Sequence, residues 1–340
     1  MSYRSFIRHL AVKQNKRKAT GSITKKRQSG VAIITALLIV TLAATVSISI
    51  STQLQLDVRR TGNLVTTDQA YIYSLLAEKS LQVILQDDEL RNGFIDILIN
   101  EGVAKQPLYI DSAFISVEVT DLSGCLNINA LIDPDGSTDT VTEDRLNALF
   151  SNSGIANNLT QAIADWIDDD LNNTIPNGAE DGYYLNLEKP YRTAQLPLVS
   201  ISELRLIKGF EDSKTYASIS ALIRGNYDQI SERFSGPILC AINTNSDTPI
   251  NINTASIEVL ESIQPGITQA QLDDVLQQRS SGALTTVPEV FTTPTNLTTE
   301  SNYYLLKSKV IIGNANKVMY SIIYWNGTNA ITLSRTQRTL

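Results

Sequence analysis

The longest uncharged segment of the chain lies near its N-terminus, where no Asp, Glu, Lys or Arg occurs between Arg27 and Asp57. From Val31 onward, the residues of this 29-residue gap are mostly apolar. About 20 predominantly apolar residues span the hydrocarbon core of a bilayer as a helix. The pattern therefore predicts a transmembrane helix over residues 31–55.

A helical pattern continues beyond this segment, now with charged residues included. Apolar side chains recur every three or four positions, which predicts a helix with one buried face: they are Leu64, Tyr71, Ile72, Leu75, Leu76, Leu81, Ile84 and Leu85. Gly62 costs such a helix about 1 kcal/mol relative to alanine. We expect residues 31–90 to form one long helix whose second half lies on a small sheet.

Strand patterns occur in two distant parts of the chain. Residues 114–120 alternate along the sequence and are rich in β-branched side chains, which is typical of a strand. A turn follows at 121–124, so residues 125–129 are expected to be the hairpin partner of that strand. Residues 303–312 and 318–325 are also strand-like.

Helical spacing predominates between these two groups of strands, from about Glu143 to Gln278. This order predicts an α+β fold in which a small antiparallel sheet is interrupted by a large α-helical insertion. The expected parts are 56–130 for the second half of the helix and the first strands, 131–295 for the insertion, and 296–340 for the last strands.

Charge is divided unequally at Gly30. The first 30 residues contain nine Lys/Arg, the only histidine (His9) and no acidic residue. The positive-inside rule keeps such a segment in the cytoplasm and sends the rest of the chain across the membrane, so we expect a single-pass membrane protein. A basic arm that binds nucleic acid is the alternative. Beyond Gly30, 35 acidic and 19 basic residues leave a formal charge of −16, which repels nucleic acid and suits cations or basic partners.

The junction of the basic and apolar segments resembles the class III signal of type IV prepilin-like proteins. In that class a prepilin peptidase cleaves after a glycine that corresponds here to Gly30, and the new N-terminus is usually methylated. Residues 1–30 would then be the leader, and Val31 would be the first mature residue. An ordinary secretory signal, cleaved beyond the apolar core near Ala43-Ala44, is the alternative.

The fifth residue after Gly30 departs from the usual pattern of this class. Mature pilins usually carry glutamate there, whereas this chain has Thr35. The glutamate is thought to pair with the amino terminus of a neighbouring subunit, because an unpaired carboxylate within the bilayer is costly. A subunit at the tip has no subunit above it, and threonine satisfies its hydroxyl on its own helix. Thr35 is therefore either a mark of a tip position or simply a tolerated helix residue.

Several motifs between residues 25 and 312 occur in the order found in protein K, the large minor pseudopilin of type II secretion systems, which the chain resembles. Among them are Asp121-Leu122-Ser123-Gly124-Cys125, Ala164-Asp165-Trp166-Ile167-Asp168, Gly178-Ala179-Glu180-Asp181, Asn251-Ile252-Asn253-Thr254-Ala255 and Ser301-Asn302-Tyr303-Tyr304. The resemblance implies a type IV pilin-like fold with an inserted α-domain, a place at the tip of the periplasmic pseudopilus, minor pseudopilins I and J as partners, and bound calcium. A minor pilin of a type IV pilus is the alternative.

The segment 165–181 contains six carboxylates and no Lys, Arg, Cys or His. Calcium prefers six to eight oxygen ligands, whereas zinc and copper prefer nitrogen and sulfur. The spacing does not match an EF-hand, and a solvated acidic loop is the alternative. Because the segment resembles the calcium region of the family, we expect structural calcium held by Asp168, Asp170, Glu180 and Asp181, with Asp165 forming local hydrogen bonds instead.

Cys125 and Cys240 are the only cysteines of the chain. A pair of this kind forms either one disulfide or two buried free thiols. Disulfides persist in oxidising compartments outside the cytoplasm, and the charge pattern places both residues there. We therefore expect a Cys125–Cys240 disulfide.

Residues 251–281 resemble a helix-hairpin-helix module, which in other proteins binds DNA phosphates. DNA affinity needs several cationic contacts, yet Arg279 is the only Lys or Arg between Asn251 and Val290. We therefore expect a packing or partner surface and no nucleic-acid partner, with an exported DNA-uptake receptor as the alternative. An enzyme is not expected, because the only histidine lies in the leader and no phosphate-loop or dinucleotide glycine pattern occurs.

Overall fold

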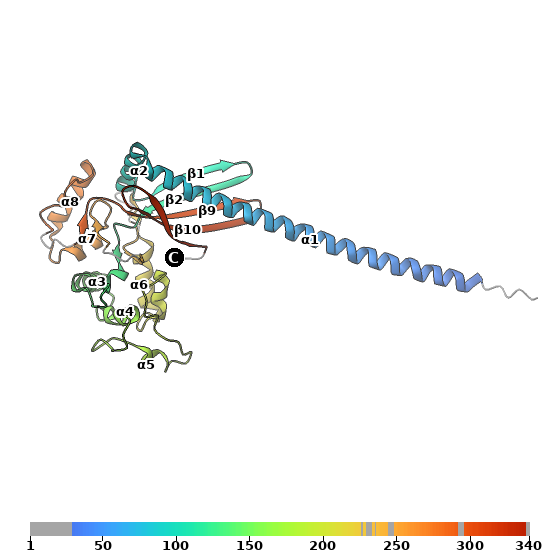
Figure 1. Cartoon of the computed structure of the whole chain (residues 1–340), viewed down its shortest axis with the longest axis horizontal. Coiled ribbons are helices and arrows are strands. Elements are labelled where there is room, and N and C mark those ends of the chain that lie inside the picture. Colours follow the sequence, from blue (N-terminus) through green and yellow to red (C-terminus); the bar gives the residue numbers. More distant parts are fainter. Residues whose placement is uncertain are drawn as a thin grey trace, which may run out of the picture. The chain divides into compact units, whose positions relative to one another are not determined.

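A computed structural model describes residues 29–225, 227–228, 233–234, 236–243, 248–291 and 296–337. The predicted leader, with His9, lies outside the described residues apart from its last two positions. The chain divides into two units, one extending to Thr61 and one formed by Gly62–Leu340. Figure 1 traces the helices and strands in chain order.

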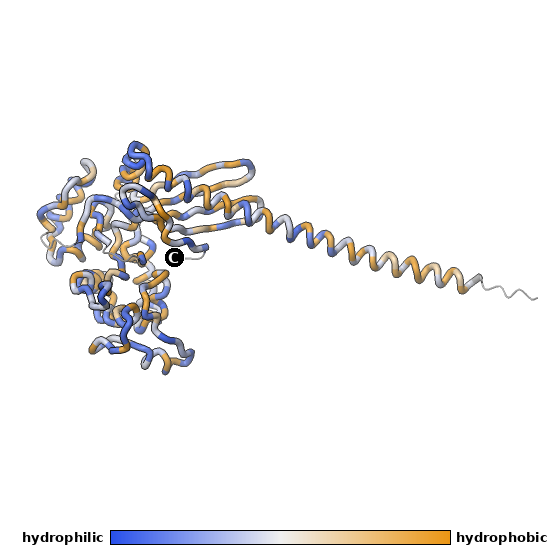
Figure 2. Tube along the Cα trace, viewed as in Figure 1, coloured by the Kyte–Doolittle hydropathy of each residue, from blue (hydrophilic) through white to orange (hydrophobic). Residues whose placement is uncertain are grey.

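The first unit is described by the N-terminal part of helix α1 (Ser29–Gln86). Its apolar side chains are exposed, as at Ile34 and Ile39, and pale and orange colours predominate along this part of the tube in Figure 2. The helix is long and apolar enough to cross a membrane. This segment therefore fits the predicted membrane anchor.

The expected single helix over residues 31–90 is instead two helices. Helix α1 ends at Gln86, and α2 (Asp88–Glu101) begins directly after Asp87. The Asp87 carboxylate accepts a hydrogen bond from the backbone N–H of Leu90 at 3.0 Å. An aspartate that caps a new helix competes with continuation of the preceding one. The apolar spacing of the sequence continues across this break and therefore does not predict it.

The sheet is a five-stranded antiparallel meander in the order β1-β2-β9-β10-β11. Its strands are β1 (Ala104–Ile110), β2 (Ala113–Asp121), β9 (Tyr303–Ile312), β10 (Ala315–Trp325) and β11 (Ala330–Thr336). Side chains of β9 alternate between two apolar clusters. Tyr304 and Leu306 pack with Leu81 and Leu85 of α1, whereas Tyr303 and Leu305 pack with Leu122 and the two cysteines on the opposite face.

The prediction of a hairpin between residues 114–120 and 125–129 is wrong. The hairpin partner of β2 is β1, and the other neighbour of β2 is β9. Residues Leu126–Asn127 form the short strand β3, which pairs in parallel with β6 (Leu239–Cys240). The apolar side chains of 125–129 are buried because they enter the insertion, while β1 is an exposed edge strand that contains Pro107 and lacks a clear apolar alternation.

The second half of α1 is fixed to the sheet by an acidic side chain as well as by apolar packing. Glu78 is 4% exposed, and its two carboxylate oxygens accept hydrogen bonds from Arg335 Nε and Nη2 at 2.7 Å each. Ser321 and Thr332 donate to the same carboxylate. Although burial alone would raise it, these hydrogen bonds hold the pKa of Glu78 below its usual value. The helix is therefore joined to β10 and β11 through an ionised carboxylate.

The insertion lies between β2 and β9, which are neighbours in the sheet. It contains η1 (Ile128–Leu131), α3 (Thr140–Asn152), α4 (Leu159–Ile167), α5 (Asp181–Tyr184), η2 (Ile201–Leu206), α6 (Ser213–Arg224), α7 (Ile257–Ile263) and α8 (Gln269–Ser281), with the short strands β4 (Tyr227–Asp228), β5 (Arg233–Phe234), β7 (Ile250–Asn251) and β8 (Leu297–Thr298). The helices precede the sheet or lie within the insertion and do not alternate with the strands of the sheet, which confirms the predicted α+β class.

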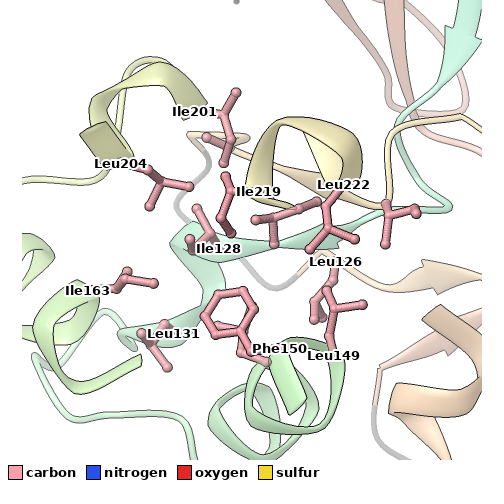
Figure 3. Packing of buried hydrophobic residues seen from close by; sticks show 14 of the residues in the cluster. Leu126, Ile128, Leu131, Leu149, Phe150, Ile163, Ile201, Leu204, Ile219 and Leu222 are labelled. Atoms are coloured by element: carbon pink, nitrogen blue, oxygen red, sulfur yellow. The ribbon is translucent and has the colours of Figure 1, made fainter. Parts of the chain in front are cut away.

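One apolar core holds the insertion together. Figure 3 shows its side chains converging from β3, η1, α3, α4, η2 and α6, including Leu126, Ile128, Leu131, Leu149, Phe150, Ile163, Ile201, Leu204, Ile219 and Leu222. Two of these residues, Leu126 and Ile128, precede the predicted start of the insertion at residue 131, and the partly buried Leu297, which packs against the core, follows the predicted end at 295.

A buried carboxylate joins the insertion to the sheet. Asp121, the last residue of β2, is 5% exposed and accepts hydrogen bonds from Ser123 N at 2.8 Å, from Ser301 Oγ at 2.6 Å and from Thr254 Oγ1. Nearby Gly124 has no room for a side chain, because an added Cβ would lie 2.7 Å from the carbonyl carbon of Thr254. Three motifs far apart in the sequence therefore meet at this junction.

The helix-hairpin-helix-like segment is part of the core of the insertion. Val259 and Leu260 of α7 and Leu272 of α8 are buried in it. Arg279 is 3% exposed, and its Nη1 donates to the carbonyl of Ala255 at 2.9 Å. Phosphate binding would depend on this arginine, but its side chain is buried and hydrogen-bonded to the backbone of the protein.

Candidate metal centre

Helix α4 supplies the first carboxylate of the candidate centre. Every residue from Ala162 to Ile167 is buried, so Asp165 is enclosed on the apolar part of this helix. Its side chain is 0% exposed, and both carboxylate oxygens accept the backbone N–H of Thr174 at 3.1 Å. An ionised group so completely buried requires further compensation.

Two more carboxylates converge on Asp165 from the ends of the following loop. Asp168 is the C-cap residue of α4, and its backbone N–H donates to Ala164 O at 2.9 Å. Glu180 directly precedes α5 and is 3% exposed. One carboxylate oxygen from each of Asp165, Asp168 and Glu180 lies within 4.8 Å of the other two.

The cluster lacks hydrogen-bond donors for several of its buried oxygens. Neither oxygen of Glu180 accepts a hydrogen bond from a described residue, and neither does Oδ1 of Asp168. Burial, followed by the charges of Asp170 and Asp165, raises the pKa of Asp168 to about 6. Burial, followed by the charges of Asp168 and Asp165, raises the pKa of Glu180 to about 7. The three carboxylates therefore repel one another unless a cation or protons neutralise them.

The geometry of this cluster fits a hard divalent cation. Calcium–oxygen distances of about 2.3–2.6 Å allow two ligand oxygens on opposite sides of the ion to lie up to about 5 Å apart. The donors are all carboxylate oxygens, which suit calcium or magnesium rather than zinc. The loop also closes tightly around them, because a Cβ at Gly178 would overlap the carboxylate of Asp165 and lie 2.6 Å from Thr174 O.

The structure brings together only two of the four ligands expected from the sequence. Asp168 and Glu180 lie in the cluster, but the exposed Asp170 instead accepts the N–H of Asn172 at 2.6 Å. Asp181 accepts the N–H and hydroxyl of Thr193 at 3.1 and 3.2 Å, and its other oxygen lies 3.3 Å from Arg192 Nη1. These two carboxylates shape the loop around the cluster.

Asp165 is the residue that the sequence reasoning assigned to local hydrogen bonding alone. It forms such a bond with Thr174, but it also belongs to the cluster. The available signal was a single acidic residue within an otherwise apolar helical segment, since aspartate is almost never fully buried unless it is paired.

The remaining residues singled out in the sequence lie elsewhere. Gly30 and Val31 are in the first turn of α1, and Thr35 Oγ1 donates to the carbonyls of Val31 at 3.1 Å and Ala32 at 3.0 Å. Cys125 and Cys240 are linked by a disulfide that closes 115 residues of sequence.

Family models match the chain mainly within the insertion. Two family models described as type II secretion system protein K match residues 124–223 and 250–302. Protein K of Aeromonas hydrophila is 30% identical over 246 residues, covering 68% of this chain and 69% of that protein. Protein K of Pectobacterium carotovorum is 28% identical over 330 residues, covering 92% of this chain and 97% of that protein.

A solved structure shares the fold. It is the crystal structure of the GspK-GspI-GspJ complex from the type 2 secretion system of enterotoxigenic Escherichia coli. The matched chain has a TM-score of 0.59 and 23% sequence identity, with coverage of 83% of this chain and 100% of that chain. The long helix on an antiparallel sheet is thus a pilin-like fold with a helical insertion.

Proposed function

Because this chain belongs to the protein K family of type II secretion systems, we propose that it caps the tip of the periplasmic pseudopilus. The chain is a minor pseudopilin, and its role is structural rather than catalytic. We place its α1 anchor in the inner membrane, its sheet and insertion in the periplasm, and cleavage by prepilin peptidase between Gly30 and Val31. At the tip it supports export of proteins across the outer membrane.

The observation that carries the tip position is the state of Thr35. Its hydroxyl is satisfied by two carbonyls of its own helix, so this residue needs no partner from a neighbouring subunit. A glutamate there would need such a partner, because an unpaired carboxylate is costly inside a membrane. A subunit with nothing above it therefore tolerates threonine at this position. The insertion adds bulk that opposes further stacking.

The partners we propose are minor pseudopilins I and J. The similar solved chain was crystallised with proteins named GspI and GspJ, which supports the same class of partner for this chain. When the full chain is co-expressed with I and J from its own secretion system, affinity purification in detergent should recover all three proteins together.

The runner-up, a minor pilin of a type IV pilus, gives the opposite result in that purification. Capture of type IV minor pilins with exclusion of I and J would overturn the proposal. A Thr35→Val variant serves as a matched control. It retains the β-branched shape of residue 35 and should still be recovered together with I and J. The buried hydrogen bond from Arg279 to Ala255 argues against the DNA-uptake alternative, because it engages the arginine inside the protein.

We further propose that Asp165, Asp168 and Glu180 hold a structural calcium ion. Support comes from the three converging carboxylates, the donor-free oxygens of Glu180 and the crowded loop at Gly178. When bound, the ion supplies the positive charge that a cluster of three carboxylates lacks. Its role would be to fix the loop between α4 and α5 and hence the outer part of the insertion.

Calcium should raise the melting temperature of the chelator-treated full chain, and Glu180→Gln should remove most of that increase. At a free calcium concentration 100 times the dissociation constant, the stabilisation is about 2.7 kcal/mol. The measurement is a thermal melt in detergent with and without calcium. Glu188→Gln is the matched control, because Glu188 is exposed and lies in the same part of the insertion. An equal calcium response in both variants would remove Glu180 from the site.

The same melts at two pH values check the electrostatic reason. Asp168 and Glu180 have raised pKa values of about 6 and about 7, so the calcium-free folded state binds protons more tightly than the unfolded chain does. Its stability should fall as pH rises from about 4 to 7. Calcium requires the deprotonated carboxylates, so the calcium-induced increase should be larger at pH 7.5 than at pH 5.5. An increase independent of pH would contradict this assignment.

A further inference from the structure

A cavity of about 600 Å³ lies between the sheet and the insertion, away from the candidate metal centre. Its lining comes from β1, β2, β9 and β10 on one side and from η2 and α6 on the other. A volume of this size falls in the range of about 300–1,000 Å³ that is usual for ligand sites. The cavity is thus large enough for a ligand or a short chain segment.

The charge of this cavity is opposite to that of the protein around it. Of the described residues that line it, four are basic and one is acidic: Lys105, Arg205, Arg224 and Lys307 against Glu118. The formal charge of the lining is therefore +3, whereas the chain beyond Gly30 carries −16. Basic residues are outnumbered almost two to one in that part of the chain, so four of them against one acid in one cavity is a local reversal of the overall pattern.

One of the four cations is already neutralised. Lys307 Nζ lies 2.8 Å from Glu118 Oε2, across the neighbouring strands β9 and β2. The hydrogen bond and charge of Glu118 outweigh burial and raise the pKa of Lys307. This pair forms a fixed, charged part of the wall on the sheet side of the cavity.

The other three cations form no ion pair within the described part of the chain. Arg205 is held by a stacking contact, with its guanidinium carbon 4.5 Å from the centre of the Tyr216 ring. A guanidinium stacked on one face keeps its N–H groups directed outward in its own plane. Lys105, Arg205 and Arg224 are all exposed, so a ligand that enters the cavity can reach them.

We propose that this cavity is a docking site for an acidic, extended polypeptide segment from another protein. The planar guanidinium groups of Arg205 and Arg224 match carboxylates in a two-point geometry, and Lys105 adds a third positive charge. Tyr320 also lines the cavity and provides an aromatic surface for the peptide between its charged side chains. This site does not depend on the tip position or on the calcium ion, and it gives an acidic pseudopilin a means to bind an acidic partner.

The test is binding of a fluorescein-labelled hexaglutamate peptide to the full chain in detergent, measured by fluorescence anisotropy at low salt. The double variant Arg205→Gln/Arg224→Gln should weaken binding by about a hundredfold, since each charge-assisted contact is worth about tenfold. Lys79→Gln/Lys189→Gln is the matched control, because it removes the same charge from exposed residues outside the cavity. It should change the dissociation constant by less than about twofold.

Two further measurements separate the proposal from a general attraction between charges. A charge-reversed variant, Lys105→Glu/Arg224→Glu, should lose hexaglutamate and gain affinity for a hexalysine peptide, which also shows that it is folded. Equal weakening by the cavity variant and the control variant would overturn the proposal. So would displacement of the peptide by inorganic phosphate at micromolar concentration, because the cavity would then be a phosphate site.

Discussion

Asp121→Ala should lower the free energy of unfolding of the protein by about 3–5 kcal/mol. Asp121 joins the end of β2 to the insertion by accepting hydrogen bonds from Ser123, Thr254 and Ser301. Removal of its carboxylate leaves those buried donors without an acceptor, at about 1–3 kcal/mol for each group. Urea denaturation of the full chain in detergent measures the change.

The two tryptophans allow a sharper version of this experiment. Trp166 lies in the insertion and Trp325 at the end of β10, so single-tryptophan versions report the two regions separately. With Asp121 present, both transitions should coincide, and in Asp121→Ala they should separate. Asp144→Ala is the control, because Asp144 is an exposed aspartate on α3. A loss of less than about 0.5 kcal/mol in Asp121→Ala, equal to an ordinary surface substitution, would contradict the joining role.

Loss of the Cys125–Cys240 disulfide should destabilise the protein by a similar amount, about 3–5 kcal/mol. The disulfide closes 115 residues of sequence, and cross-linking a loop of about 100 residues removes unfolded-state entropy worth up to about 4.7 kcal/mol. Both cysteines are buried, at 3% and 5% exposure. Urea denaturation of Cys125→Ala/Cys240→Ala measures the loss.

Single substitutions and a reductant provide the internal checks for the disulfide. Cys125→Ala alone and Cys240→Ala alone should each cost nearly as much as the double variant, because either one removes the same cross-link. Dithiothreitol should destabilise the original protein and leave the double variant unchanged. Additive single losses, or an equal effect of dithiothreitol on both proteins, would show that the cysteines stabilise through packing instead.

Elements whose pattern reflects their own burial were predictable from the sequence. The strand expected at 303–312 is β9 over the same residues, because its side chains are buried on both faces of a central strand. The sequence does not indicate strand β1, because this strand is exposed and contains Pro107, so its pairing with β2 leaves no alternation of apolar and polar residues. Residues 125–129 pack in the insertion and not beside β2, and an apolar run does not show which of two cores will bury it.

The sequence indicates the segment in which the three carboxylates cluster, but it names only two of them as ligands. Density of carboxylates in residues 165–181 pointed to the region, and Asp168 and Glu180 do converge there. Sequence order does not show which way a loop directs its side chains, so the partners of Asp170 and Asp181 were not foreseeable. The same limit hid the basic cavity, whose lining residues are spread from Val103 to Tyr320.

The sheet does not need the insertion to bring β2 and β9 together. Asp121 and Tyr304 are directly paired across β2 and β9, so both ends of the insertion meet at neighbouring backbone positions. Insertions between adjacent chain ends are tolerated because they disturb few contacts. A short turn between β2 and β9 would leave every strand pairing of the meander unchanged. The strand pairing of the sheet is therefore independent of the length of the chain that connects β2 and β9.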